Sequence, residues 1–214
     1  MKVSYGITVH NEAEELIKLL EVLSKNIDDE DEIVVCVDGD DEKVEAVLGE
    51  YLSENKAIVY KRKLDGNFAE HKNSVIEKAS GDYVFHIDAD EYPNKILIQQ
   101  LKEILEINEV DLIWIPRVNT IDGMEQIHIE RWGWKVTENG WVNYPDYQSR
   151  VFRRDGKIRW ERPLHELIRG VKTYAHLPPH EELSLYHPKT MKKQEAQNRF
   201  YNQNFSKEMN VRKM

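Results

Sequence analysis

Two aspartates separated by a single alanine follow a short apolar run in the first half of the chain. The run extends from Tyr83 to Ile87, and Asp88 and Asp90 come directly after it. A buried strand that stops in carboxylates delivers them to the edge of a sheet, where α/β proteins bind ligands. Residues two apart in an extended chain point the same way, so these carboxylates would repel each other unless a cation lay between them. The spacing therefore predicts a site for Mn²⁺ or Mg²⁺, with a solvated acidic turn as the structural alternative.

Composition limits the cellular setting and the partners. The 214 residues are 40% hydrophobic, which is enough for one sizeable core, and we expect a single domain over residues 1–214. A net charge of -9 argues against broad binding to nucleic acid. Cys36 is the only cysteine, so no disulfide can form within the chain, and a cytoplasmic setting is favoured. No apolar run approaches the roughly 20 residues that span a bilayer.

Strand and helix signals alternate along the first half of the chain. Short apolar segments begin near residues 2, 32, 57 and 83, and amphipathic helical segments lie between them, the first of them capped by Asn11. This order predicts a mostly parallel sheet with helices on both faces. The carboxyl ends of its strands should meet at one edge, which would hold His10, Asp38, Asp88 and Asp90.

The second half has a different character. We expect a helix over 94–108, a strand over 111–118, a hairpin that turns at 154–157 between strands over 148–153 and 157–160, and a short strand over 183–187. A polar helix should follow from residue 189. The chain would then divide into a nucleotide and metal half (1–95), an acceptor half (96–188) and a C-terminal helix (189–214).

Aromatic and cationic residues are concentrated between residues 130 and 165. Four of the five tryptophans lie there, beside several arginines. Any single tryptophan is more simply explained as core of a small β layer, whereas the group as a whole suggests a binding wall for sugars or phosphates. The members are Trp132, Trp134, Trp141, Trp160, Arg131, Arg150, Arg153, Arg154, Arg159 and Arg162.

Five motifs in the same order resemble the family 2 glycosyltransferases, which have the Rossmann-like GT-A fold and use nucleotide-diphosphate sugars. Residues 7–14 resemble the opening strand and helix start of that family, and 35–41 resemble its second strand. Residues 67–73 and 79–83 are similar to the helix before its metal motif, and 87–91 are similar to that motif. The resemblance implies a GT-A sheet with a smaller, aromatic-rich β region for the acceptor.

The resemblance also implies site residues. The metal would be held by Asp88, Asp90 and His187. His187 would correspond to the histidine near the end of the domain that completes the metal or diphosphate site in many GT-A enzymes. The structural alternative is a histidine at the end of a strand that makes one backbone hydrogen bond. The family's Asp-Asp-Gly-Ser turn is replaced here by residues 38–41, so Asp38 is the expected reader of the nucleotide base and Asp40 the alternative. Residues implied in nucleotide-sugar binding are Thr8, Val9, His10, Glu12, Asp38, Lys72, Asp88 and Ala89.

Transfer of a sugar to a hydroxyl also requires a general base. Glu166 is the candidate for this base, because it occupies the place where similar enzymes carry their catalytic carboxylate. His165 would orient Glu166 or contact the diphosphate. The rivals are Glu130, Asp146 and Glu161, and the structural alternative for Glu166 is a surface acid on a short helical turn. The Gln-x-x-Arg-Trp signature of processive members is absent, which implies one transfer per encounter.

These features together predict an inverting, metal-dependent hexosyltransferase of glycan biosynthesis. Its donor would be UDP-glucose or a similar UDP-sugar, and its acceptor a hydroxyl of a glycan or another molecule. A sugar-phosphate nucleotidyltransferase is an alternative, but it would need a glycine-rich phosphate loop after the first strand, and residues 10–13 contain no glycine. A haloacid-type phosphatase would need a small hydroxylated residue after the aspartates, where Glu91 stands. A non-catalytic sugar-binding module on the same scaffold is a further alternative.

Overall fold

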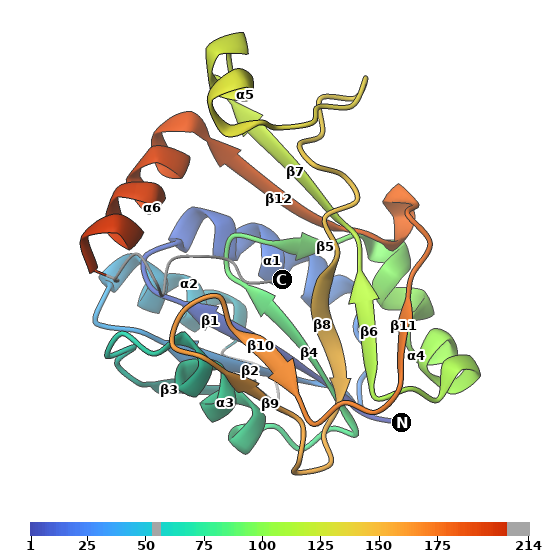
Figure 1. Ribbon diagram of the computed structural model, residues 1–214. Coiled ribbons are helices and arrows are strands. Elements are labelled where there is room, and N and C mark those ends of the chain that lie inside the picture. The colour runs from blue at the N-terminus through green and yellow to red at the C-terminus, as the bar shows by residue number, and fades with distance from the viewer. Residues whose placement is uncertain (53–56, 205–214) are drawn as a thin grey trace.

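A large, mostly parallel sheet forms the centre of the protein, as the sequence predicted. The computed structural model describes residues 1–52 and 57–204, and within them this sheet has seven strands in the order β11-β6-β8-β4-β1-β2-β3 (Figure 1). Six of the seven run in one direction, and β8 is antiparallel to both of its neighbours. The strands are β1 (Val3–Val9), β2 (Glu32–Val37), β3 (Ala57–Lys61), β4 (Tyr83–Asp88), β6 (Leu112–Ile115), β8 (Gln148–Arg153) and β11 (Tyr174–His176).

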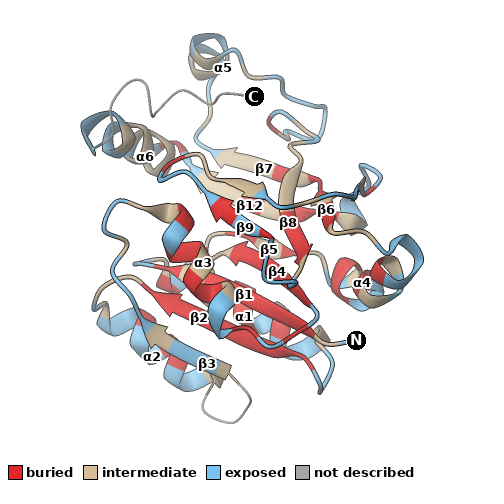
Figure 2. Cartoon of the chain, turned by 60° about the horizontal axis from the view of Figure 1, so that its bottom comes forward, coloured by how far each residue is buried: buried red, intermediate tan, exposed pale blue. Residues whose placement is uncertain are grey.

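Helices cover both faces of the sheet and bury its apolar side chains (Figure 2). Helices α1 (Ala13–Asn26), α2 (Glu42–Leu52) and α4 (Lys95–Asn108) contribute leucines and valines to the larger core cluster. On the other face, α3 (Phe68–Lys78) packs with Val34, Val84 and Phe152. Strand β2 is buried at every position, which explains why its sequence is a continuous apolar run instead of an alternating pattern.

A smaller sheet stands beyond the carboxyl end of β4. It has the order β5-β12-β7, built from β5 (Tyr92–Pro93), β12 (Leu185–Thr190) and β7 (Arg117–Asp122). Two helices, α5 (Gln126–Trp132) and α6 (Met191–Asn204), lie at the end of this sheet (Figure 1). The remaining elements are β9 (Arg159–Glu161), β10 (Leu167–Arg169) and the 3₁₀ helix η1 (Glu181–Leu183).

Two expectations for the second half were wrong. The strand expected over 111–118 divides at Pro116 into β6 and β7, which belong to different sheets, because proline has no amide hydrogen to continue a ladder. The hairpin expected around residues 154–157 keeps its turn, in which Asp155 accepts hydrogen bonds from two following amides, but β8 and β9 do not pair. Strand β8 lies between β4 and β6, so neither of its edges is free for β9, which pairs with β10.

The C-terminal helix begins at Met191, close to the predicted start at residue 189. It is α6, and the remainder of the expected helix, residues 205–214, lies outside the described residues. None of the helices in the described ranges combines the length and apolar character that crossing a membrane requires.

Candidate active site

The ends of β1, β2 and β4 meet at one edge of the sheet. Thr8 of β1 stands opposite Asp88 of β4, and the amide of Ala89 donates to the carbonyl of Thr8 at 3.1 Å. On the other side, the amide of Asp38 donates to the carbonyl of Val9 at 2.8 Å. Five residues that the sequence assigned to nucleotide-sugar binding are therefore neighbours, because parallel strands place their carboxyl ends together.

His10 and Asp38 form one end of this edge. The Nδ1 atom of His10 lies 2.6 Å from the backbone oxygen of Asp38 and 3.5 Å from its Oδ2 atom. The amide of Leu64 donates to Oδ1 of Asp38 at 3.0 Å, which fixes the carboxylate. Asp40, the alternative reader of the base, is highly exposed and pairs with Lys61 at 2.7 Å. The geometry therefore favours Asp38 over Asp40 as a group directed at a ligand.

Glu12 holds the loop between β1 and α1. Its Oε2 atom accepts hydrogen bonds from the amides of His10, at 2.9 Å, and Asn11, at 3.1 Å. Helix α1 begins at Ala13 with Glu12 at the N-cap position, so the expectation that Asn11 caps this helix was wrong. A carboxylate that accepts from two successive amides fixes the backbone of the loop, which places His10 over Asp38.

Asp88 and Asp90 do not lie in one extended segment. Strand β4 ends at Asp88, and the chain then turns, with the amide of Glu91 donating to the carbonyl of Asp88 at 2.8 Å. The expectation of an extended backbone through both aspartates was therefore wrong. Asp88 contacts Arg150 at 2.6 Å and Lys72 at 3.4 Å. Burial alone would raise the pKa of Asp88, but the charges of Arg150 and Lys72 hold that pKa well below its usual value.

Asp90 faces His187, and the hydrogen bonds around His187 define its tautomer. The Nδ2 group of Asn119 donates to the carboxylate of Asp146 at 3.0 Å and to the carbonyl of Val142 at 3.4 Å. Its Oδ1 atom must then be the atom 2.8 Å from Nδ1 of His187. An amide oxygen only accepts, so Nδ1 of His187 carries the proton. The other ring nitrogen, Nε2, lies 3.4 Å from Oδ2 of Asp90.

This arrangement fits a cation. Burial and the charge of Arg117 lower the pKa of His187, whereas the hydrogen bond and the charge of Asp90 act in the opposite direction. A carboxylate and an imidazole are both side chains that bind divalent metals, so Asp90 and His187 are candidate ligands. Within the described residues, no group of three or more His, Cys, Asp or Glu side chains is arranged to hold a metal. Mg²⁺ sites commonly have one or two protein ligands and complete their coordination with phosphate oxygens and water.

A buried network of charges supports the turn after β4, and the sequence reading did not anticipate it. The fully buried carboxylate of Glu91 accepts from Arg150 and from Arg117, each at 2.7 Å. Arg117 also pairs with Asp146, and Arg150 connects Glu91 to Asp88. The sequence signals were a third acid directly after the aspartate pair and an arginine directly after Pro116. The network fixes the backbone between Asp88 and Glu91.

We expect the Glu91→Gln variant to lose about 3 kcal/mol of unfolding free energy, because it leaves two buried guanidinium groups without their shared carboxylate. Asp40→Asn is the matched control, since it breaks only the exposed pair with Lys61, and little loss of unfolding free energy is expected there. Urea unfolding of both variants measures the difference. Equal, small losses in the two variants would contradict a structural role for the network.

Glu166 is connected to the same edge of the sheet by Lys72, which contacts both Glu166 and Asp88. The Nζ atom of Lys72 lies 2.9 Å from Glu166 and 3.4 Å from Asp88. Burial alone would lower the pKa of Lys72, but Asp88 and Glu166 raise it above its usual value, so Lys72 stays charged. The side chain of Asn73 exchanges two hydrogen bonds with the backbone of Trp160, at 2.9 and 2.8 Å, which ties the segment before Glu166 to α3.

The rival acids have other partners. Asp146 pairs with Arg117, and Glu161 is an exposed acid 3.8 Å from Arg169. Glu130 accepts from Gln126 on α5 at 2.9 Å. Of the four candidate bases, Glu166 is the one that the described structure brings into contact with the Lys72 and Asp88 pair. His165 precedes it with a φ of 52°.

The tryptophans of the second half separate into two groups. Trp160 is buried in the core, edge-on to Phe152 at 5.9 Å, so the core interpretation holds for it. Trp132 and Trp134 are partly exposed at the end of α5, with ring centroids 4.7 Å apart. Trp132 is therefore one of the tryptophans with a surface that a ligand can contact.

Comparisons with known proteins agree with this geometry. The model of "Glycosyl transferase family 2" matches residues 4–176. The SPbeta prophage-derived glycosyltransferase SunS of Bacillus subtilis (strain 168) is 26% identical over 168 residues, which are 77% of this chain and 34% of that protein. The uncharacterized glycosyltransferase EpsJ of the same organism is 26% identical over 82 residues, which are 38% of this chain and 24% of EpsJ. The chain thus spans about a third or less of these relatives.

Solved structures show the same fold. Residues 1–349 of S. aureus TarS in complex with UDP superpose with a TM-score of 0.63 at 17% identity, over 88% of this chain and 60% of that one. The corresponding TarS complex with UDP-GlcNAc gives a TM-score of 0.61 at 18% identity, over 88% of this chain and 58% of that one. Since the family model covers most of the sequence and the sheet is that of the GT-A neighbours, this chain belongs to glycosyl transferase family 2.

Proposed function

We propose that the protein is a metal-dependent, inverting glycosyltransferase that moves a sugar from a UDP-sugar to a hydroxyl group. The single observation that carries this proposal is the position of Lys72, whose ammonium group contacts both Asp88 and Glu166. It places the candidate base beside the carboxylate at the end of β4. Inversion requires a base that takes the acceptor proton while the diphosphate leaves from the opposite side of the sugar.

The nucleotide would lie along the edge formed by the ends of β1, β2 and β4. Asp38 would accept the hydrogen of a uracil ring, and Thr8, Val9, His10, Glu12 and Ala89 would shape the pocket. The UDP and UDP-GlcNAc complexes of TarS support this choice of donor. The positive charge of Lys72 and the carboxylate of Asp88 would meet the diphosphate and the donor sugar.

The metal would be held by Asp90 and His187, with Asp88 as the further predicted ligand. Both Arg150 and Lys72 already contact Asp88, which favours a role in donor positioning for this carboxylate. Mn²⁺ or Mg²⁺ would stabilise the charge that develops on the leaving diphosphate. The 3.4 Å distance between Nε2 of His187 and Oδ2 of Asp90 supports their assignment to one site.

Glu166 would remove the proton from the acceptor hydroxyl. As the acceptor oxygen attacks the anomeric carbon, the bond from that carbon to the diphosphate breaks, and the proton remains on the Glu166 carboxylate. His165 would orient this carboxylate. The acceptor would enter along the segment from Arg131 to Arg162, because the opposite side is already assigned to nucleotide and metal.

A screen of UDP-glucose, UDP-galactose and UDP-GlcNAc with Mn²⁺ tests the proposal. We expect one donor to be hydrolysed slowly to UDP and free sugar, and we expect excess EDTA to stop the reaction. A nucleotidyltransferase would instead release pyrophosphate from UTP and a sugar phosphate, and a sugar-binding module would release nothing. Either of these outcomes would refute the proposed activity.

We expect Asp38→Asn to weaken UDP binding about tenfold, because a neutral amide oxygen accepts a hydrogen bond more weakly than a carboxylate. Asp40→Asn should leave the affinity unchanged, since Asp40 is directed at Lys61. Titration calorimetry with UDP measures both variants. The reverse order of effects would transfer the base-reading role to Asp40.

A further inference from the structure

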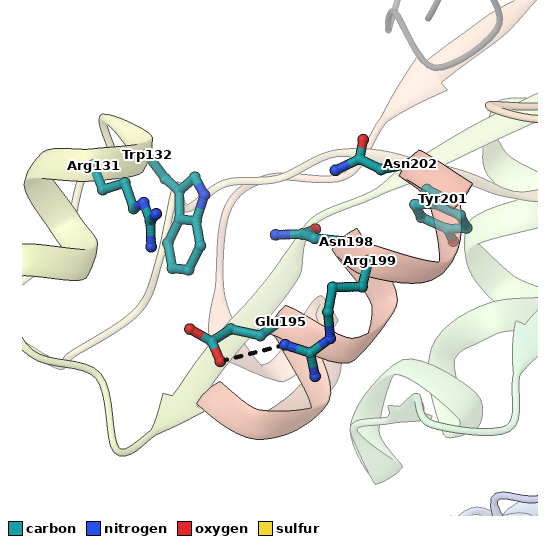
Figure 3. A pocket seen from close by; sticks show the side chains of 7 residues that line it. All are labelled: Arg131, Trp132, Glu195, Asn198, Arg199, Tyr201 and Asn202. Atoms are coloured by element: carbon teal, nitrogen blue, oxygen red, sulfur yellow. Dashed lines mark ion pairs between the residues drawn. The ribbon is translucent and has the colours of Figure 1, made fainter. Parts of the chain in front are cut away.

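A cleft of about 420 Å³ lies between α5 and α6. The indole of Trp132 projects from α5 toward α6, and the side chains of α6 form the opposite wall (Figure 3). Trp134 packs against Trp132, with ring centroids 4.7 Å apart, and holds the indole in place. Residues that line the cleft include Arg131, Trp132, Glu195, Asn198, Arg199 and Tyr201.

The chemistry of the lining suits a carbohydrate. An indole offers an apolar face on which the C–H face of a sugar ring can stack. Across the cleft, the side chains of Glu195, Asn198 and Arg199 are planar and can form paired hydrogen bonds with neighbouring hydroxyl groups. A lipid chain or an apolar peptide would desolvate these groups without pairing them, which costs free energy.

One residue links the lining of the cleft to the surroundings of the candidate base. Tyr201 lines it, and the ring of Tyr201 lies 6.2 Å from the ring of His165, the residue before Glu166. Helix α6 is also fixed to the metal side, because Lys193 lies 2.8 Å from Glu15 and 3.8 Å from Asp90. Tyr201 therefore belongs both to the lining of the cleft and to the surroundings of His165.

We propose that the cleft between α5 and α6 binds a sugar ring of the acceptor, and that α6 determines which acceptor is used. The inference rests on the proposed transferase function and adds its acceptor class. The family match ends at residue 176, whereas α6 spans Met191–Asn204. Recognition of the acceptor would thus depend on a segment outside the matched region, which allows the same donor site to serve different acceptors.

Binding is tested first without transfer. Saturation-transfer NMR with methyl glycosides of glucose, galactose, mannose, N-acetylglucosamine and glucuronic acid, in the presence of UDP and Mn²⁺, should detect at least one ligand. We expect Trp132→Ala and Asn198→Ala to abolish its signal. Tyr174→Ala and Gln203→Ala are the controls, because these exposed side chains lie outside the cleft, and they should keep the signal. n-Octanol is added to the series as an apolar probe. The inference would be overturned if the wild type gave no signal with any glycoside, or if n-octanol were the only ligand detected.

A second matched pair isolates the guanidinium group. Arg199 lies 3.9 Å from Glu195 in the cleft, and Arg169 lies 3.8 Å from Glu161 outside it, both in exposed ion pairs. We expect Arg199→Ala to raise the acceptor KM about three- to tenfold, in the range of one lost hydrogen bond, and Arg169→Ala to leave it unchanged. Equal KM values for the two variants would remove Arg199 from acceptor recognition and contradict the role of α6.

Donor hydrolysis separates this inference from the function on which it rests. If the wild type releases UDP from no donor, the transferase proposal fails, whatever the NMR result. If UDP release is normal in every cleft variant but acceptor KM and glycoside binding are also unchanged, the transferase proposal stands and the acceptor cleft is refuted.

Discussion

Replacing Glu166 with glutamine should lower the rate of sugar transfer by about 10²- to 10⁴-fold, the range expected for loss of a positioned general base. The amide keeps the shape of the side chain and can still accept a hydrogen bond from Lys72, 2.9 Å away in the wild type. It cannot take a proton from the acceptor hydroxyl. The affinity for the UDP-sugar should therefore remain close to that of the wild type.

Single-turnover transfer at saturating donor, measured beside donor affinity, tests this expectation. Glu161→Gln and Glu130→Gln are the matched controls, because both acids are exposed and contact neither Lys72 nor Asp88 in the described structure. Asp146→Asn completes the set, and there we expect lower stability, since Asp146 pairs with Arg117. A Glu166 variant that transfers at the wild-type rate while one of the other three is inactive would place the base elsewhere and leave the metal proposal untouched.

Replacing Asp90 with alanine should abolish the gain in UDP affinity that Mn²⁺ provides, because no neutral side chain replaces the lost carboxylate ligand. His187→Ala should have the same effect if the two side chains form one ligand pair, as their 3.4 Å separation suggests. Calorimetry of UDP with Mn²⁺ and with EDTA measures the gain. Asp40→Ala, which removes a carboxylate that pairs with Lys61, is the control and should retain it.

Two further variants sharpen the metal test. Asn119→Ala removes the acceptor that fixes the proton on Nδ1 of His187, and loss of such an orienting partner typically lowers metal affinity about 10- to 100-fold. Asp88→Ala should be nearly as damaging as Asp90→Ala, although it also removes one of the two carboxylates that Arg150 and Lys72 each contact and should reduce stability. An unchanged Mn²⁺ dependence in the Asp90 variant would remove the metal site at this position.

The sequence by itself determined the nucleotide half of the protein. Apolar runs that end in Asp38 and in Asp88 are local signals, and the alternation of strands and helices requires the carboxyl ends of β1, β2 and β4 to meet. A mostly parallel sheet with these strand ends at one edge could therefore be predicted from the sequence, and the resemblance to family 2 glycosyltransferases added the GT-A fold and the candidate nucleotide-binding residues. The sequence also indicated a candidate base, Glu166, by its position after the aromatic segment.

Only the tertiary structure decided which charges meet. The family resemblance had assigned His187 and Asp90, 97 residues apart, to one site, but nothing in the sequence connected Arg150 with Glu91, which are 59 residues apart. Their contacts depend on two features of the sheets: β8 lies between β4 and β6, and the chain leaves the large sheet at Pro116 to pair β7 with β12. Hydrophobic periodicity reports which face of an element is buried, but it carries no information about the partner against which that face packs. The pairing of Lys72 with Glu166 and the cleft between α5 and α6 are for this reason properties of the fold, which the spacing of residues along the chain could not supply.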